Sequence, residues 1–261
     1  MLFYSPSQVA ALRMTIACLC LFPFVIRRAK EIPKELWKYV ILVGFLGNGI
    51  PSFLFTYAET QISSSMAGVL NALTPVFTLL VGLLLFKTRL TFYHMSGVVV
   101  GFGGAFFLLM FGADKEVSSQ PVYGLLIVAA TLCYALSVNI IRNKLHSLDA
   151  MLISGWSLMV VGFLSMMYLA STDVAHRFAH FEGAETGILY VVVLALFGTA
   201  ISLVLYNKLI KMTGALFASS TTYIIPVIAL LWGLMDNEKT TPMQLSGFAA
   251  ILLGVYLVNK K

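Results

Sequence analysis

Long runs of apolar residues alternate along this chain with short polar connections. The runs are about 20 residues long, the length at which an α-helix crosses roughly 30 Å of hydrocarbon. Within lipid, a helix satisfies the backbone polar groups of such a segment internally. The pattern therefore predicts an all-α membrane protein, a polytopic bundle of nine transmembrane helices. Their expected limits are 8–26, 39–58, 66–86, 93–113, 121–141, 150–171, 187–207, 214–235 and 242–258.

Composition and charge agree with a membrane protein. Apolar residues make up 59% of the 261 residues, and uncovered apolar helices of this length have no stable arrangement in water, so membrane lipids are the expected surroundings. The net charge is +6, but Lys and Arg are spread over several connections, which indicates no nucleic-acid partner. Cys18, Cys20 and Cys133 lie inside apolar runs without metal or haem spacing, and we expect no cofactor and no metal.

Two parts of the chain repeat one another, 65–110 and 214–256. Each has an apolar segment with a proline, a short polar turn, and a second apolar segment with glycines. An internal repeat is stronger evidence about the architecture than any single motif in the sequence. The matching pairs are Pro75 and Pro226, 151 residues apart, and Gly97 with Gly247 and Gly104 with Gly254, each 150 apart.

The repeat predicts two halves, 1–113 and 121–261, joined by an external linker at 114–120. The second half starts with the fifth span and has five helices, whereas the first half shows four, so we expect a helix to be missing before Pro6. Halves with an odd number of helices are inserted in opposite senses. Such inverted five-helix repeats are typical of secondary transporters.

Lys and Arg gather in every second connection and so predict the orientation. One side carries thirteen of them and the other three, which places the first group and the C-terminus in the cytoplasm by the positive-inside rule. The thirteen are Arg27, Arg28, Lys30, Lys34, Lys38, Lys87, Arg89, Arg142, Lys144, Lys208, Lys211, Lys260 and Lys261, and the three are Lys115, Arg177 and Lys239.

Two further stretches stand out: Ser5-Pro6 with Ala10-Ala11-Leu12-Arg13, and Gly124 through Cys133-Tyr134-Ala135 to Arg142. Together with the two repeated parts, they resemble the EamA-type permeases of the drug/metabolite transporter superfamily. The first stretch resembles the family's second helix, and the second resembles the first helix of the family's second half. The two repeated parts resemble the family's proline helix, turn and glycine helix. The resemblance covers nearly the whole chain. The resemblance implies an inner-membrane location and small organic metabolites as substrates. It also implies ten helices, of which this chain is expected to lack the first.

One position departs from the family pattern. The second copy has the family's turn glutamate as Glu238, whereas the first copy has Thr88 at the corresponding place. This departure argues against a symmetric role for the carboxylate in gating.

Polar and aromatic side chains within the spans are candidates for a substrate pathway, because polar groups that face lipid are costly. Pro75 and Pro226 lie deep within expected helices, where proline frees a backbone carbonyl, and we expect them to shape the pathway. For the other candidates, hydrogen bonding across helices is the alternative. The candidates are Asn48, Tyr57, Asn71, Thr74, Pro75, Tyr134, Trp156, Thr199, Thr221, Tyr223 and Pro226.

Three further features have two interpretations each. Arg13 lies inside the first span, where it contacts an anionic group or has a structural role at the interface. The glycines of the repeat allow close helix packing, either within the scaffold or between the protomers of a homodimer. His176 and His180 have the i, i+4 spacing of a metal site but lack a third ligand, which favours a solvated loop.

Together these patterns predict a secondary transporter of small organic metabolites, amino-acid-like or drug-like, that exports them by alternating access between two inverted halves. No nucleophile elbow, phosphate-binding loop or pair of intramembrane carboxylates is present in the sequence, so we expect no enzyme. Two alternatives stay open: an intramembrane enzyme acting on lipid-linked substrates, and an inactive, truncated transporter fragment.

Overall fold

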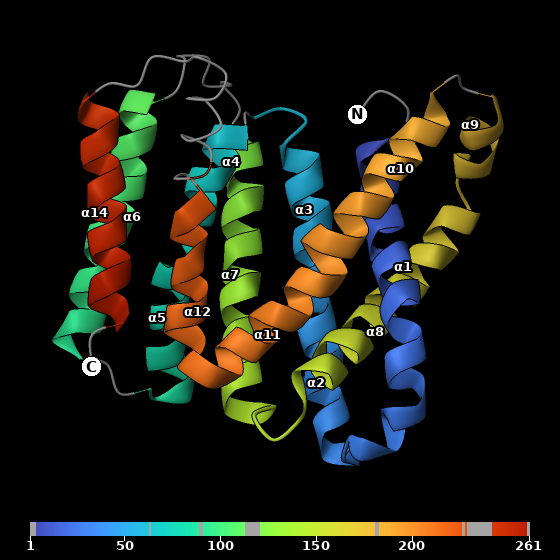
Figure 1. Cartoon of the computed structure of the whole chain (residues 1–261), viewed down its shortest axis with the longest axis horizontal. Helices are drawn as coiled ribbons and strands as arrows, with labels where there is room; N and C mark the ends of the chain where they lie inside the picture. Colours follow the sequence, from blue (N-terminus) through green and yellow to red (C-terminus); the bar gives the residue numbers. More distant parts are fainter. Residues whose placement is uncertain are drawn as a thin grey trace. The chain divides into compact units, whose positions relative to one another are not determined.

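The structure, a computed structural model, describes residues 4–62, 64–88, 91–112, 121–180, 183–225, 228 and 242–259. All regular elements in these ranges are helical (Figure 1). The chain forms two compact units, each built from two segments far apart in the sequence. Unit 1 comprises Met1–Tyr57 and Ile140–Met212, and unit 2 comprises Ala58–Asn139 and Thr213–Lys261. Each unit therefore takes helices from both predicted halves, while the boundaries of those halves stay a prediction.

Unit 1 contains long helices that are interrupted at defined points. Two of the interruptions, η3 and η4, are π-helical turns. The first segment forms α1 (Pro6–Val25), η1 (Ile26–Glu31), η2 (Lys34–Leu36), α2 (Trp37–Gly44), η3 (Phe45–Gly49) and α3 (Ile50–Ala58). The second forms α8 (Ala150–Ala170), α9 (Val174–His180), α10 (Ala184–Ala195), η4 (Leu196–Ile201) and α11 (Ser202–Thr213).

Unit 2 contains the two parts of the internal repeat and most of α7. Its elements are α4 (Ser64–Asn71), α5 (Thr74–Phe86), α6 (Phe92–Gly112), α7 (Pro121–Lys144, whose last turn belongs to unit 1), α12 (Ala215–Ser220), η5 (Thr221–Tyr223) and α14 (Pro242–Asn259).

Five segments of the described residues are long and apolar enough to cross a membrane, judged by length and composition. They are Pro6–Glu31, Lys34–Ala58, Val122–Lys144, Ala150–Ala170 and Ala184–Thr213, and they match five of the nine expected spans. The expected spans 93–113 and 242–258 correspond to α6 and α14. Much of the expected span 214–235 lies outside the described residues.

The expected span 66–86 is not one continuous helix, which corrects the prediction for Pro75. The helix α4 ends at Asn71, and α5 begins at Thr74 with Pro75 in its first turn. Proline has no N–H to bond back to residue 71, and its fixed φ suits the first turn of a helix. Pro75 thus starts a helix after a break instead of lying deep within one. Its partner in the repeat, Pro226, lies outside the described residues.

The two long helices α1 and α8 pack closely in unit 1. A Cβ at Gly155 would lie 2.4 Å from Cγ1 of Val25, and one at Gly162 would lie 2.3 Å from Cβ of Cys18. These contacts run in opposite order along the two helices, so α1 and α8 are antiparallel. Beside them, a core cluster joins Met14, Ala17 and Leu21 of α1, Leu158 and Val161 of α8, and Ala200 of η4.

In unit 2, α6 and α14 lie side by side (Figure 1) and use the predicted glycines. A Cβ at Gly97 would lie 2.6 Å from the amide nitrogen of Val258, and one at Gly104 would lie 2.8 Å from the carbonyl oxygen of Gly247. These helices are equivalent in the repeat, and the order of their contacts makes them antiparallel. The glycines therefore serve helix packing inside unit 2, as the scaffold interpretation predicts.

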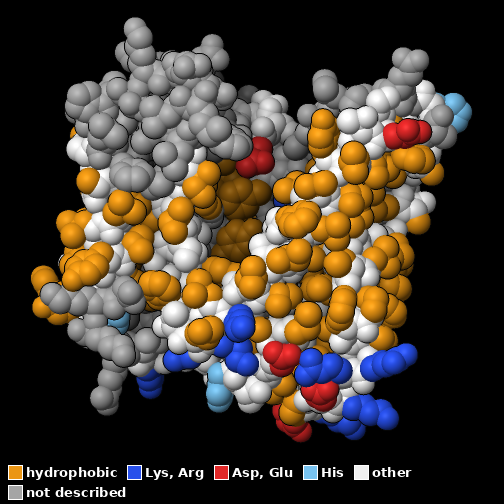
Figure 2. All heavy atoms as spheres, viewed as in Figure 1, with side chains coloured by type: hydrophobic (Ala, Val, Ile, Leu, Met, Phe, Trp, Pro, Cys, Tyr) orange, Lys and Arg blue, Asp and Glu red, His pale blue; other side chains and the backbone are white. Residues whose placement is uncertain are grey.

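Charged and apolar side chains occupy different parts of the surface of unit 1. Figure 2 shows hydrophobic side chains over its helices and Lys and Arg side chains gathered at one end. There Arg28 forms ion pairs with Asp149 at 3.0 Å and Glu31 at 2.8 Å, while Arg142 donates to the carbonyl of Lys211. A broad exposed apolar surface with charges at its end fits a protein surrounded by lipid.

Candidate functional site

The π-helical turn η3 has a local cause in the sequence. Pro51 follows it and has no N–H, so the carbonyl of Gly47, four residues earlier, receives no hydrogen bond from position 51. The amide of Ile50 instead bonds to Phe45, five residues back. A Cβ at Gly44 would lie 2.6 Å from the carbonyl oxygen of Ser157, so this glycine lets η3 and α8 approach each other.

The second π-helical turn, η4, has no proline. The residue after it, Ser202, donates its hydroxyl to the carbonyls of Gly198 at 2.8 Å and Thr199 at 3.3 Å. A side-chain hydroxyl thus satisfies carbonyls that an uninterrupted α-helix would bond through its amides. π-Helical turns inside α-helices are frequent at functional sites, which directs attention to both turns.

A buried polar network connects η3 and α11 through α8. Asn48 donates to the hydroxyl of Ser157 at 3.4 Å, and Asn207 donates to the hydroxyl of Ser154 at 2.7 Å. Ser157 in turn donates to the carbonyl of Ser154 at 3.0 Å. All four residues are buried. Their groups are neutral and both donate and accept hydrogen bonds, so the network suits a polar ligand without net charge.

Several buried polar atoms lack a hydrogen-bond partner in the described part of the chain, and all of them lie in unit 1. An unpaired buried group costs about 1–3 kcal/mol, and each case calls for an explanation such as water or a ligand. The atoms are Arg13 Nε, Thr15 Oγ1, Ser52 Oγ, Trp156 Nε1, Thr199 Oγ1 and Asn207 Oδ1.

Aromatic candidates of unit 1 have different environments. The ring of Trp156 meets that of Trp37 edge-on, with centroids 4.9 Å apart, so its orientation is fixed by packing. Its buried Nε1 has no hydrogen-bond partner among the described residues. Tyr57 is 56% exposed. Trp156 is therefore the better placed of the two to offer a donor inside the unit.

Three of the unit 2 candidates donate hydrogen bonds to backbone carbonyls, two of them locally. Thr74 donates to the carbonyl of Asn71 at 2.7 Å, next to the break that precedes α5. Thr221 donates to the carbonyl of Ala218 at 2.7 Å. The fully buried Tyr223 donates its hydroxyl to the carbonyl of Val98 at 3.2 Å. Tyr134 is half-buried on α7.

A cavity of about 430 Å³ lies in unit 1 between η3 and α3 on one side and α8 on the other. Its walls are almost entirely apolar, with hydroxyls only at Ser165 and Tyr168. This volume lies within the usual range for small-molecule pockets. The lining residues are Phe45, Gly49, Ile50, Phe53, Leu54, Val161, Leu164, Ser165 and Tyr168.

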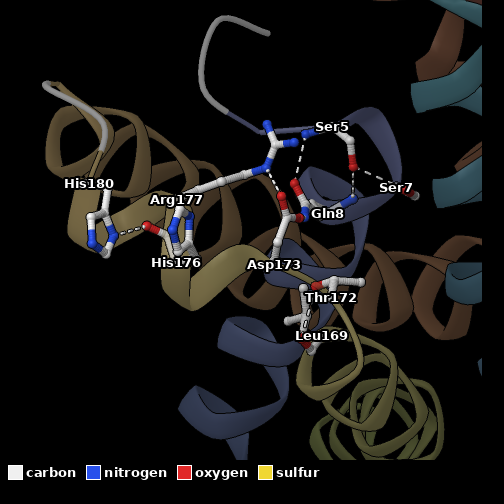
Figure 3. Close-up of polar contacts among 9 residues, drawn as sticks. All are labelled: Ser5, Ser7, Gln8, Leu169, Thr172, Asp173, His176, Arg177 and His180. Atoms are coloured by element: carbon white, nitrogen blue, oxygen red, sulfur yellow. Dashed lines mark hydrogen bonds and ion pairs between the residues drawn. The ribbon is translucent and has the colours of Figure 1, made fainter.

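At the start of α1, a polar cluster ties this helix to the turn between α8 and α9 (Figure 3). Ser5 and Gln8 form a capping box, and Gln8 also donates to Asp173 Oδ1 at 2.7 Å. Arg177 Nε lies 2.6 Å from Asp173 Oδ2. The hydrogen bond from Arg177, and then that from Gln8, lowers the pKa of Asp173, so this carboxylate stays charged at neutral pH.

The two histidines on α9 stack on one another, with ring centroids 4.2 Å apart, and His180 Nδ1 lies 2.9 Å from the carbonyl oxygen of His176 (Figure 3). Within the described ranges, no group of three or more His, Cys, Asp or Glu side chains has the geometry to hold a metal ion. The i, i+4 spacing therefore has no third ligand in this part of the chain.

The predicted site residues fall into both units. Unit 1 holds Arg13, Asn48, Tyr57, Trp156 and Thr199, and unit 2 holds Asn71, Thr74, Pro75, Tyr134, Thr221 and Tyr223. Sequence reasoning missed Ser52, Ser154, Ser157 and Asn207. Small polar residues three positions apart in an apolar run, as in Ser154 and Ser157, would have indicated a polar helix face.

Helices of membrane-spanning length, an apolar surface and buried polar groups in the interior together define a multi-pass membrane protein with the features of a solute carrier. The model of the EamA-like transporter family matches residues 1–110 and 122–260. The chain belongs to the EamA-like transporter family, within the drug/metabolite transporters.

Relatives with known names are similar along nearly the whole chain. The inner membrane transporter YedA of Escherichia coli K12, which is uncharacterized, is 26% identical over 98% of this chain and 82% of its own. An S-adenosylmethionine/S-adenosylhomocysteine transporter of Chlamydia muridarum is 22% identical, covering 97% and 83%. A probable terminal-alkyne amino-acid exporter of Streptantibioticus cattleyicolor is 23% identical, covering 99% and 85%.

A solved crystal structure has the same fold. It matches 97% of this chain and 87% of its own with a TM-score of 0.73 at 20% sequence identity. At this identity the likeness concerns the fold alone.

Proposed function

We propose that this protein is a secondary carrier that exports a small, amino-acid-like organic solute across the inner membrane by alternating access between two halves of inverted topology. The observation that carries the proposal is the set of buried polar groups in unit 1 that have no partner among the described residues, all of them neutral except Arg13. In an otherwise apolar helical protein such groups suit a solute that is bound by hydrogen bonds and released again.

The antiparallel packing of α6 and α14 supports the inverted repeat. These helices occupy equivalent positions in the two repeated parts, and the glycine contacts run in opposite order along them. Equivalent helices with opposite directions are what an inverted repeat requires. The two halves then present similar pathways to the two sides of the membrane.

The names of two relatives support the substrate class. S-Adenosylmethionine and a terminal-alkyne amino acid both contain an α-amino acid group, and the second name is that of an exporter. Asn48, Ser52 and Thr199 offer hydrogen bonds without charge. A zwitterionic solute with little net charge fits them better than a strongly charged one.

The location and orientation rest on a relative and on charge. YedA is named as an inner membrane transporter, and three of the basic connections meet at one end of unit 1 through Arg28, Arg142 and Lys211. By the positive-inside rule, we place this end and the C-terminus in the cytoplasm.

Flux into proteoliposomes tests the proposal. Vesicles with purified protein, preloaded with unlabelled L-methionine, should take up labelled L-methionine saturably and faster than vesicles without preloading, because a carrier exchanges its solute. Protein-free vesicles are the control. If no labelled amino acid or amino-acid derivative shows saturable flux, the carrier proposal fails. A positive result would also exclude the inactive fragment.

The intramembrane enzyme is the weaker alternative, because the relatives with a named activity are transporters. Conversion of a lipid-linked substrate by the purified protein, with no solute flux, would favour it instead. The pathway candidates, the role of Arg13 and the formation of a homodimer remain predictions.

A further inference from the structure

The two π-helical turns of unit 1 occupy equivalent positions in the two halves. The turn η3 starts at Phe45 and η4 at Leu196, 151 residues later, the same separation as between Pro75 and Pro226. Around each turn the sequence matches as well, with Tyr39 against Tyr190, Gly47 against Gly198 and Ile50 against Ile201. The two turns match in both backbone geometry and sequence, so chance is a poor explanation for their equivalent positions.

The backbone hydrogen bonds leading into the two turns are also the same. The amide of Phe45 is shared between the carbonyls of Ile41 and Leu42, and the amide of Leu196 is shared between those of Val192 and Val193. All of these positions differ by 151 residues. Both helices thus change their hydrogen-bond register at the same step.

Different residues follow the two turns, so proline alone does not explain the pair. Position 51 is Pro51, which has no N–H, but the equivalent Ser202 has one and could continue an α-helix. Nevertheless η4 is π-helical. A turn that persists after its proline is replaced points to a role at this position of the fold, and π-helical turns are frequent at functional sites.

The fourth residue of each turn is polar and buried. Asn48 and Thr199 are each 7% exposed. Asn48 has a long hydrogen bond of 3.4 Å to Ser157, and Thr199 Oγ1 has no partner in the described part of the chain. Ser52, one turn after Asn48, is 1% exposed, and its hydroxyl also has no partner among the described residues. Buried polar groups normally find partners, so these groups are available to hydrogen-bond a ligand or water.

We propose that η3 and η4 are a matched pair of substrate contacts, in which Asn48, Ser52 and Thr199 hydrogen-bond a polar solute without net charge. The segments that carry the two turns, 39–58 and 187–207, contain no Asp, Glu, Lys or Arg, which favours a solute without net charge at these contacts. This inference rests on the proposed carrier function and adds to it the two equivalent points at which the solute is held.

Reactivity of engineered thiols tests the pair without a known substrate. In a protein whose Cys18, Cys20 and Cys133 are replaced by alanine, Asn48→Cys and Thr199→Cys should both react with a charged methanethiosulfonate reagent, because the reagent needs water to reach the thiol. The matched control is Thr131→Cys. Thr131 is buried in α7 and donates to the carbonyl of Val128 in its own helix, and it should not react.

Each result has a defined meaning once gel filtration has shown that the variants are folded. If either Asn48→Cys or Thr199→Cys fails to react, the matched pair is refuted. Ser52→Cys, a nearly isosteric change, gives a second measurement of thiol reactivity at η3. Reaction at both positions without any saturable solute flux would refute the carrier function and leave the pair of contacts standing.

Protection from labelling tests the class of solute. L-Methionine at millimolar concentration should slow the labelling of both cysteines at least several-fold, and more than L-lysine or L-glutamate. If only a charged amino acid protects, or none of the three does, the assignment of a net-neutral solute is wrong.

Discussion

Gly101 and Gly254 touch through their backbones: a Cβ added to Gly254 would lie 2.4 Å from both the Cα and the nitrogen of Gly101. No side chain fits there, because real Cβ atoms do not approach backbone atoms so closely. The contact fixes the distance between α6 and α14, two helices that are equivalent in the repeat. Close backbone approach through glycine is a common way to join helices in membranes.

Replacing Gly254 by alanine should therefore destabilise the protein by about 1–3 kcal/mol, the usual cost of overpacking. The measurement is the thermal unfolding midpoint of the purified protein in detergent. Gly103→Ala is the matched control on α6, since a Cβ there would meet nothing within 4 Å. It should leave the midpoint unchanged or raise it, because alanine favours a helix. Equal loss in both variants would contradict the packing argument.

The hydrogen bond between Asn207 and Ser154 should contribute measurably to the stability of unit 1. Asn207→Ala removes a donor from a buried hydroxyl and should cost about 1–3 kcal/mol. In a double-mutant cycle, Asn207→Ala and Ser154→Ala should show a coupling of about 0.5–3 kcal/mol. Ser171→Ala, in the turn after α8, is the control partner and should be additive with Asn207→Ala. Additivity in both pairs would mean that the 2.7 Å contact contributes nothing.

The ion pair of Asp173 predicts a pH dependence. Its pKa is lowered in the folded protein by Arg177 and then Gln8, so the stabilisation is complete above the ordinary pKa of Asp, about 3.9, and is lost as the pH falls through the lower folded value. Asp173→Asn should thus lower the unfolding midpoint slightly at pH 7, because a solvent-exposed ion pair contributes little, and by less as the pH falls below the ordinary pKa of Asp.

The control for Asp173 is Glu35→Gln, a change at an exposed carboxyl for which the described residues offer no ion pair. Glu35→Gln should change the unfolding midpoint at pH 7 by less than Asp173→Asn does. A midpoint difference for Asp173→Asn that grows as the pH falls would mean that the carboxylate is destabilising in the folded state.

Hydrophobic patterning was sufficient to predict the positions of the long helices. The expected span 150–171 is the helix α8, Ala150–Ala170, because an apolar run bounded by Asp149 and Ser171 leaves little choice of ends. A glycine face on α6 and on α14 also followed from spacing, since residues three, four and seven apart share a helix face, but the contact between these two helices did not.

Local changes of helix type could not be predicted in this way. The turns η3 and η4 and the break before Pro75 depend on which amide bonds to which carbonyl, and apolar residues suit an α-turn and a π-turn equally well. Pro75 was expected in a helix interior and begins a helix instead. The contact between Asn207 and Ser154 depends on how distant helices pack, which a single sequence does not reveal.

Labelling from the two sides of the membrane tests the topology on which the transport mechanism depends. Lys30 lies beyond the end of α1 and His176 beyond the end of α8, and both side chains are exposed. Since α1 and α8 are antiparallel, these positions lie at opposite ends of the pair. In cells expressing a cysteine-free background, His176→Cys should react with an impermeant maleimide from outside, whereas Lys30→Cys should react only after the membrane is permeabilised. Reaction of both from the same side would rule out that α1 and α8 cross the membrane as an antiparallel pair, and with it the alternation of two inverted halves.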